Sequence, residues 1–399
     1  MFVPISNTPR PYAWGDRTAI AGLLGREASG GPEAELWLGA HSGSPATILD
    51  PEAVGGYDRL DEWIAADPER AIGSDRSRLP FLLKVLAAAR PLSLQAHPSA
   101  GQAVVGYEKE NAAGVPVDAP DRNYRDAYHK PELILALSDR FQALCGFRPL
   151  EQTRLLLAAL VPAGVSAEVD ELRELLGADG DAKALRRSVR WILTGTDEQT
   201  TALIDALTAG ASRKGVEDFA AERATLLDLA GAYPGDPGVV VALLLNRVEL
   251  RRGQVLFLPA GNIHAYLEGL GIELMAASDN VLRGGLTSKH VDVPELLAVL
   301  DFTPIDAAPL APERLADGVV RFDPDVPDFS LVHALGDDVG PVAVPVRGPV
   351  VVLATGGSFE LRSSGDATRL VRGEAVYVTP GERELTIEGS GELFIATIG

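Results

Sequence analysis

The sequence contains a single cysteine, Cys145, among its 399 residues. One cysteine excludes a disulfide within the chain and is typical of a reducing compartment. The opening stretch MFVPISNTPRPYAWG lacks the basic start and the apolar run of a secretory signal peptide, so we expect a cytoplasmic protein. The longest apolar run, VVVALLL at 239–245, is far shorter than the roughly 20 residues that a membrane helix needs, so we expect no membrane span.

Basic residues are also scarce. Lysine and arginine number 36 against 56 aspartates and glutamates, which gives a formal charge of −20. Such a chain repels nucleic acid and anionic membrane surfaces, so we expect neither as a partner. Any anionic substrate must therefore meet a local basic pocket. Hydrophobic residues make up 46% of the chain, which is ample for a buried core.

The chain divides into segments of different character. Residues 1–148 are rich in glycine, proline and short apolar runs, which predict a mixed, mostly β unit. Residues 149–235 carry leucine, alanine, glutamate and arginine at helical spacing, bounded by helix-ending residues, and predict a helical domain. The β pattern returns at 236–304, which we group with 1–148 as one domain. Residues 305–399 form a further β domain.

An internal repeat links the last two β segments. Residues 252–269, RGQVLFLPAGNIHAYLEG, align without gaps to residues 372–389, RGEAVYVTPGERELTIEG. His264 in the first copy corresponds to Glu384 in the second. The repeat predicts two related β-barrels, of which the second has lost its chemistry. The first copy also resembles the second metal motif of the cupin (jelly-roll) superfamily, in which a histidine supplies an inward ligand.

Polar residues alternate in two otherwise apolar strands. In RPLSLQAHPS (90–99), Gln95 and His97 share one face, and in the strand that starts at HKPELILAL, Lys130 and Glu132 do the same. Together with His264, the residues Gln95, His97 and Glu132 provide one amide oxygen, two imidazoles and one carboxylate, which suit zinc. Taken singly, each of these residues is as well explained by an ordinary buried or strand-start position, but the set as a whole favours a metal site.

The strings YAWG, ELWLGAH, SLQAHP, HKPE, LPAGNIHAYLEG and ASDNVLRGGLTSKH occur in order between residue 12 and about 290. As a set, they resemble the type I mannose-6-phosphate isomerases (phosphomannose isomerases) of the cupin superfamily. The resemblance implies a mainly β protein: a cupin jelly-roll catalytic domain, an α-helical insert, and a degenerate cupin-like C-terminal barrel without metal ligands. It also implies one Zn²⁺ per chain, held by Gln95, His97, Glu132 and His264.

The implied reaction interconverts D-mannose 6-phosphate and D-fructose 6-phosphate through an enediol or enediolate. The resemblance places the catalytic residues at Arg283, Lys130, His129, Glu273 and Asp279. It places substrate contacts at Ser93, Lys289, Trp14 and Glu35, of which Ser93 and Lys289 would hold the phosphate. It implies a role in mannose metabolism and GDP-mannose biosynthesis. We expect a small sugar phosphate as the ligand and a monomeric protein.

Two other functions remain open at this point. Two histidines and one carboxylate also serve iron-dependent cupin oxygenases, although Gln95 and the cations Lys130, Arg283 and Lys289 argue against that chemistry. A sugar-phosphate sensor that has kept the barrel but lost turnover is the second alternative. Metal analysis and a turnover assay separate these hypotheses.

Overall fold

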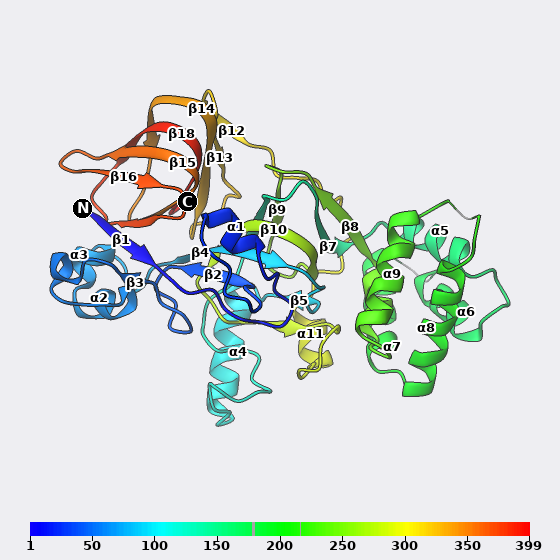
Figure 1. Ribbon diagram of the computed structural model, residues 1–399. Coiled ribbons are helices and arrows are strands. Elements are labelled where there is room, and N and C mark those ends of the chain that lie inside the picture. Colours follow the sequence, from blue (N-terminus) through cyan, green and yellow to red (C-terminus); the bar gives the residue numbers. More distant parts are fainter. Residues whose placement is uncertain (178–179, 216) are drawn as a thin grey trace.

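The computed structural model describes residues 1–177, 180–215 and 217–399, in which two antiparallel sheets lie beside a bundle of helices (Figure 1). We call the sheets the central sheet and the C-terminal sheet. The central sheet consists of β2 (Glu35–Leu38), β4 (Phe81–Ala88), β5 (Gln95–Ala96), β6 (Glu132–Ala136), β7 (Phe141–Phe147), β8 (Leu245–Leu250), β9 (Val255–Leu258), β10 (His264–Ala276) and β11 (Leu282–Arg283).

The long strand β10 organises the central sheet. Its first half pairs with β5 and β7, and its second half pairs with β4 and β6. A register shift between Tyr266 and Glu268 separates the two halves. Apolar runs such as FLLKVLAA in β4 are buried throughout, because the sheet is covered on both faces. One strand thereby brings residues from distant parts of the chain to one place.

The segment 90–99 is less regular than its alternation predicts. Only Gln95 and Ala96 form a strand, because Pro91 and Pro98 have no amide hydrogen to donate to a ladder. The predicted sidedness nevertheless holds for the apolar positions, since Leu94 and Ala96 are fully buried in a hydrophobic core.

The C-terminal sheet draws on both ends of the chain. The N-terminal strand β1 pairs with β17, so that Phe2 lies opposite Val378, and β3 pairs with β1. Figure 1 shows that both termini lie at this sheet. Its strands are β1 (Phe2–Ser6), β3 (Thr47–Ile48), β12 (Glu313–Ala316), β13 (Val319–Phe322), β14 (Ser330–Pro345), β15 (Val350–Arg362), β16 (Ala367–Val371), β17 (Ala375–Val378) and β18 (Glu384–Thr397).

Helices fill the segment with helical spacing. Ser166 and Thr196 each cap the start of a helix by accepting a hydrogen bond from a backbone amide of the first turn. The apolar faces of these helices pack into a core that is continuous with the central sheet. The helices are α5 (Leu150–Leu160), α6 (Ala167–Leu176), α7 (Asp181–Leu193), α8 (Asp197–Ala211) and α9 (Ala220–Ala232). A further helix, α10 (Gly238–Leu243), lies beyond residue 236, where the sequence pattern predicted β structure.

Shorter helices cover the sheets and connect their strands. α4, which projects below the central sheet in Figure 1, has a capping box in which Ser99 and Gln102 bond each other's backbone amides. None of the described helices is both long and apolar enough to cross a bilayer. The remaining helices are α1 (Ala19–Leu24), the 3₁₀ turn η1 (Pro51–Val54), α2 (Leu60–Ala66), α3 (Pro68–Ile72), α4 (Ala100–Ala112) and α11 (Val293–Val299).

Both copies of the repeat fold as a short strand, a turn and a long strand. The first copy is β9 and β10 in the central sheet, and the second is β17 and β18 in the C-terminal sheet. Gly253 and Gly373 precede the short strands with φ of 82° and 90°, a conformation that favours glycine. His264 and Glu384 occupy equivalent places as the first residues of the long strands. His264 is buried and Glu384 is exposed.

Candidate metal centre and substrate pocket

Three of the predicted metal ligands lie together in the central sheet. His97 follows β5, Glu132 begins β6 and His264 begins β10. All three are buried, and one ligand atom from each lies within 4.8 Å of the others. Glu132 Oε1 is 3.3 Å from His97 Nε2, and Glu132 Oε2 is 3.3 Å from His264 Nε2. The two imidazoles therefore face the same carboxylate.

Backbone carbonyls orient both imidazoles. His97 Nδ1 lies 2.7 Å from the carbonyl oxygen of Asn280, and His264 Nδ1 lies 3.2 Å from that of Asn262. Because a carbonyl oxygen only accepts, each Nδ1 carries the hydrogen and each Nε2 presents a lone pair. A hydrogen bond from the other ring nitrogen to a backbone carbonyl is typical of metal-binding histidines.

The lone pair on Nε2 of His97 is placed to bind a cation. Among the described residues no hydrogen bond reaches its buried Nε2, and an unsatisfied buried acceptor costs about 1–3 kcal/mol. Burial, reinforced by the charge of Lys130, lowers the pKa of His97 to about 4, so the ring is neutral near pH 7. A neutral imidazole lone pair that points at a carboxylate is a donor set that a divalent metal ion fits.

Gln95 stands beside this cluster. It lies directly opposite His264 in one ladder and opposite Arg283 in the other. Side chains directly opposite each other in antiparallel strands project from the same face. The amide of Gln95 therefore shares the face of His264 and supplies an oxygen donor at the edge of the cavity described below.

Lys130 controls the charge of Glu132. Its Nζ is 3.1 Å from Glu132 Oε1, and the side chain is almost fully buried. Burial alone would raise the pKa of Glu132, but Lys130 and His97 together hold that pKa well below its usual range. Glu132 is therefore a permanent carboxylate, as a metal ligand has to be.

A cavity of about 360 Å³ opens next to the metal cluster. Six residues that the sequence places in the site line it together, although they come from distant segments. They are Trp14, Glu35, Ser93, Gln95, Arg283 and Lys289. This volume suits a small ligand, since ligand pockets generally measure about 300–1,000 Å³.

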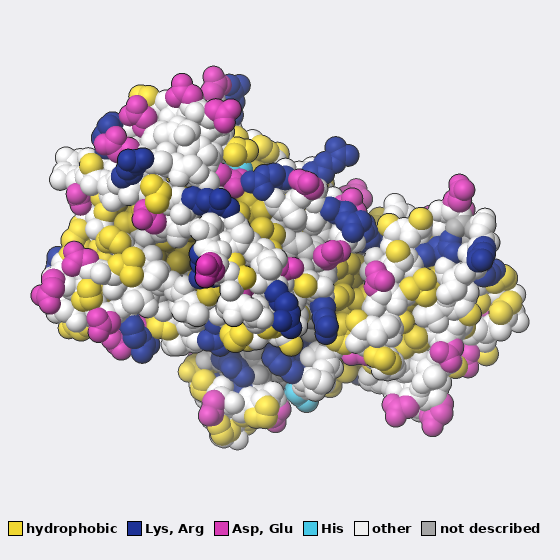
Figure 2. All heavy atoms as spheres, viewed as in Figure 1, with side chains coloured by type: hydrophobic (Ala, Val, Ile, Leu, Met, Phe, Trp, Pro, Cys, Tyr) yellow, Lys and Arg dark blue, Asp and Glu magenta, His cyan; other side chains and the backbone are white. Residues whose placement is uncertain are grey.

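The cavity contains cations that lack an anionic partner. In the described parts of the chain, no ion pair engages the side chains of Arg283 and Lys289, which line it, or of Arg125, which lines a neighbouring cavity. Burial and the neighbouring Arg125 lower the pKa of Arg283, and burial with both arginines lowers the pKa of Lys289. On the face shown in Figure 2, Lys and Arg side chains gather over the region of β5 and α11. An otherwise acidic protein thus presents a local anion site.

Lys84 is a buried cation that the sequence reasoning missed. It lies in the middle of β4, and its Nζ is 2.8 Å from Glu273 Oε2 and 3.6 Å from Glu35 Oε1. Burial alone would lower the pKa of Lys84, but Glu273 and Glu35 raise it. Burial, Glu132 and Glu35 raise the pKa of Glu273. The sequence does contain a signal for this buried cation, which is the position of the lysine inside the apolar run FLLKVLAAA.

Four predicted catalytic residues lie outside the lining of this cavity. Lys130 and Glu273 are buried beside Glu132 and Lys84, and the other two are His129 and Asp279. His129 turns its ring to the C-terminal part of the chain, where Nε2 is 2.7 Å from Asp328 Oδ2. Asp279 pairs with His41 at 3.2 Å and leaves 45% of its side chain exposed. Burial opposes ionisation of Asp279, but His41 and Lys130 lower its pKa. Both residues flank the site rather than line its cavity.

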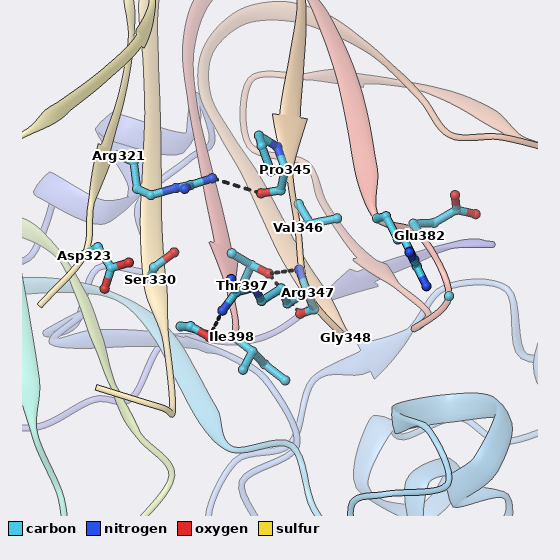
Figure 3. A pocket seen from close by; sticks show the side chains of 13 residues that line it. Arg321, Asp323, Ser330, Pro345, Val346, Arg347, Gly348, Glu382, Thr397 and Ile398 are labelled. Carbon is cyan, nitrogen blue, oxygen red and sulfur yellow. Dashed lines mark hydrogen bonds between the residues drawn. The ribbon is translucent and has the colours of Figure 1, made fainter. Parts of the chain in front are cut away.

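A larger cavity of about 630 Å³ lies at one end of the C-terminal sheet (Figure 3). Two of its arginines are engaged by backbone: Arg321 donates to the carbonyl of Pro345, and Arg347 donates to that of Gly399. The lining includes Ser330 and Thr397 but no histidine. Among the described residues, its carboxylates Asp323 and Glu382 belong to no cluster that could hold a metal ion, so the smaller cavity is the candidate active site.

Two antiparallel sheets with a buried site of two histidines and one carboxylate, next to a cationic cavity, define a metalloenzyme for a small anionic substrate. The family model for the catalytic domain of type I phosphomannose isomerase matches residues 2–150. The mannose-6-phosphate isomerase of Salmonella typhimurium is 37% identical over 329 residues, which cover 82% of this chain and 81% of that protein. The chain belongs to the mannose-6-phosphate isomerase family.

Other relatives agree. The human mannose-6-phosphate isomerase is 36% identical over 361 residues, covering 82% of this chain and 81% of its own. A crystal structure of the Salmonella typhimurium enzyme bound to fructose 6-phosphate and zinc superposes with a TM-score of 0.87 at 33% identity. That comparison covers 100% of this chain and 99% of the other. A structure of a mannose 6-phosphate isomerase with zinc and yttrium gives the same TM-score of 0.87.

Proposed function

We propose that this protein is a zinc-dependent isomerase that interconverts D-mannose 6-phosphate and D-fructose 6-phosphate. The observation that carries the proposal is the buried cluster of His97, Glu132 and His264 beside a cavity with the unpaired cations Arg283 and Lys289. A relative bound to fructose 6-phosphate and zinc supports the substrate and the metal. The acidic chain and the phosphate ligand are compatible because the cavity is locally positive.

Gln95, His97, Glu132 and His264 would hold one zinc ion per chain. Their amide oxygen, imidazole nitrogens and carboxylate are donors that zinc accepts, and one anionic donor leaves the site with net positive charge. When bound, zinc would supply Lewis acidity that polarises a sugar oxygen. The protein's part is to orient both imidazoles, which the carbonyls of Asn280 and Asn262 do.

The isomerisation opens the sugar ring and moves a proton between C1 and C2. We assign ring opening or proton transfer to Lys130, which is buried beside Glu132. The pair of Lys84 and Glu273 can store a proton. Glu273 and Glu35 favour the protonated form of Lys84 against the effect of burial, and burial with Glu132 and Glu35 favours the protonated form of Glu273. Glu35 lines the cavity and lies 3.6 Å from Lys84, so it can pass a proton between the pair of Lys84 and Glu273 and the substrate.

The remaining site residues bind the substrate or support the site. We assign Arg283 to the enediolate charge, because it is a desolvated cation next to Gln95 in the ladder. Ser93 and Lys289 would bind the phosphate, and Trp14 would form a wall of the pocket. Asp279 and His129 support the site from its flanks, as their partners His41 and Asp328 indicate.

We further propose that the central sheet is a cupin jelly-roll and that the C-terminal sheet is its degenerate relative. The repeat across β9–β10 and β17–β18 supports this proposal. The domains are 1–148 with 236–304 (catalytic), 149–235 (helical) and 305–399 (C-terminal). This division assigns residues by sequence, although β1 and β3 contribute strands to the C-terminal sheet.

We propose a cytoplasmic monomer that acts in mannose metabolism and supplies GDP-mannose biosynthesis. The free, buried Cys145 agrees with a reducing compartment. Neither nucleic acid nor membrane is expected as a partner of a chain with a charge of −20.

The test is turnover with controlled metal content. Purified protein is stripped with a chelator, restored with zinc, and incubated with mannose 6-phosphate, while fructose 6-phosphate is detected by a coupled enzymatic assay. We expect activity to disappear on stripping and to return with zinc. Glu132→Gln should abolish activity and zinc retention, whereas Glu268→Gln, which changes an exposed glutamate of β10, should preserve both.

Two results would overturn the proposal. Stoichiometric iron with oxygen uptake would indicate an oxygenase. Tight binding of mannose 6-phosphate by the zinc-loaded protein without fructose 6-phosphate formation would indicate a sensor.

A further inference from the structure

The segment 125–131 carries catalytic residues without regular structure. It has no helix or strand, yet it leads directly to Glu132 at the start of β6 and contains Lys130. Among the described residues, one backbone–backbone hydrogen bond holds this segment, from the amide of Ala276 to the carbonyl of Pro131 at 3.0 Å, so the placement of Lys130 also depends on side chains that hold the segment from outside. Fixing one residue's backbone costs about 1–2 kcal/mol in entropy, so several strong contacts are needed.

Two of these contacts come from the central sheet's own connections. The fully buried side chain of Asn280 accepts a hydrogen bond from the amide of Arg125 at 2.7 Å and donates to the carbonyl of Tyr128 at 2.8 Å. The guanidinium of Arg78 lies 3.5 Å from the centre of the Tyr128 ring. Both contacts end at Tyr128, two residues before Lys130.

The third contact comes from the C-terminal part of the chain. Asp328, in the connection that precedes β14, accepts a hydrogen bond from His129 at 2.7 Å between Nε2 and Oδ2. Asp328 is 6% exposed, and His129 is the immediate neighbour of Lys130. The contact therefore lies closer along the chain to the catalytic lysine than the other two. Hydrogen bonds to a carboxylate are short and strong, which suits this role.

We propose that Asp328 is a positioning residue that fixes Lys130 and Glu132 through His129, so that the C-terminal unit contributes directly to catalysis. The inference rests on the isomerase function proposed above. It explains why a histidine lies directly before Lys130 although its ring contacts Asp328 and does not line the cavity. It also gives the C-terminal unit, which carries the exposed Glu384 at the position of His264, a part in the reaction.

The experiment compares two substitutions of Asp328 with a matched control. Asp328→Ala removes the hydrogen bond, whereas Asp328→Asn keeps an oxygen acceptor and removes only the charge. A displacement of about 1 Å in a catalytic group costs up to about 10²-fold in rate. We expect kcat of the alanine variant to fall about 10–100-fold with KM nearly unchanged, and the asparagine variant to recover most of this loss.

Glu392→Gln is the control, because Glu392 is another buried carboxylate of the C-terminal sheet that binds a side chain from the central sheet. Its oxygens lie 2.7 Å from Arg252, far from the segment 125–131 in the sequence. If the C-terminal unit acted only through general stability, the control would lower kcat as much as Asp328→Ala does. We expect it to lower stability and leave kcat intact.

His129→Gln removes the same contact from its other side. Because His129 is partly exposed, this substitution should disturb folding less than the loss of the buried carboxylate of Asp328. In the double variant with Asp328→Ala, the losses in kcat should not add, because both substitutions remove one contact. Zinc affinity, measured by competition with a chromophoric chelator, should fall for Asp328→Ala and not for Glu392→Gln, because Glu132 is displaced.

Three outcomes would overturn the inference while the wild type still isomerises mannose 6-phosphate. They are unchanged kcat and zinc affinity in Asp328→Ala, equal effects of the control, and full additivity in the double variant. Inactive zinc-loaded wild-type protein would instead refute the proposed function. The two failures are thus distinguishable.

Discussion

Lys84→Met tests the electrostatics beneath the cavity. The substitution keeps a long side chain but removes the only cation that lies near both Glu273 and Glu35 among the described residues, at 2.8 Å and 3.6 Å. Both glutamates are buried, so one of them has to take up a proton for the variant to fold. With an unfolded-state pKa of about 4.3, that protonation costs about 3.7 kcal/mol at pH 7 and about 1.6 kcal/mol at pH 5.5.

The pH dependence gives the prediction its sign. A carboxyl group whose folded-state pKa lies above its unfolded value contributes stability at low pH and loses it as pH rises through the folded-state pKa. The difference between variant and wild type should therefore shrink by about 2 kcal/mol between pH 7 and pH 5.5. The wild type shares part of this trend, since burial already raises the pKa of Glu273, so the difference is the quantity to measure.

Urea unfolding of the metal-free proteins measures this difference. Tryptophan fluorescence is a suitable signal, because the ring of Trp37 lies 5.1 Å from Lys84 Nζ. Lys109→Met is the matched control: Lys109 is 72% exposed and pairs with Glu295 at 3.4 Å, so its loss should change stability by at most about 1 kcal/mol. Equal losses for the two variants, or a Lys84→Met loss that grows at pH 5.5, would refute the reasoning.

Two further predictions concern the C-terminal sheet and the cavity. Burial opposes ionisation of Glu392, but His333, Thr355 and Arg252 lower its pKa, so its contribution to stability is present above the unfolded-state pKa of about 4.3 and is lost as pH falls through the folded value. Glu392→Gln should therefore destabilise by about 1–2 kcal/mol at pH 7 and by less at pH 4, and equal losses in urea unfolding would contradict this sign. Arg283→Ala should lower kcat about 10²–10³-fold if Arg283 stabilises the enediolate, while Arg140→Ala, at an exposed site, should not. A rise in KM alone would reassign Arg283 to ground-state binding of the phosphate.

The metal ligands could be predicted because their signals are local. The alternation of Gln95 and His97 and the spacing Pro259-x-Gly261-x-x-His264 each lie within a few residues of sequence. A strand period of two and a tight turn fix where such side chains point, whatever the rest of the chain does. The structure brings His97, Glu132 and His264 within 4.8 Å of one another, as those local patterns imply.

The contacts that the sequence did not reveal depend on distant partners. The buried position of Lys84 is explained by its ion pair with Glu273, 189 residues further along the chain. The resemblance places His129 among the catalytic residues, but the partner of its ring, Asp328, lies 199 residues away and has no local signal. The pairing of β1 with β17 likewise has no local signal. Apolar alternation predicts that a strand forms, and it leaves open which strand will be its neighbour.

The repeat separates what the backbone requires from what the chemistry requires. Gly253 and Gly373 keep the same positive φ, so the turn before each short strand imposes the same demand in both copies. No shared backbone conformation restricts the first residue of the long strand, which is His264 in one copy and Glu384 in the other. Glu384 is exposed, and water solvates its charge, whereas a glutamate at the buried position of His264 would set a second carboxylate against Glu132. An exposed first residue therefore allows the C-terminal copy to carry a glutamate where the central sheet carries a buried histidine, and the C-terminal part of the chain contacts the segment before Glu132 through the hydrogen bond of Asp328 with His129.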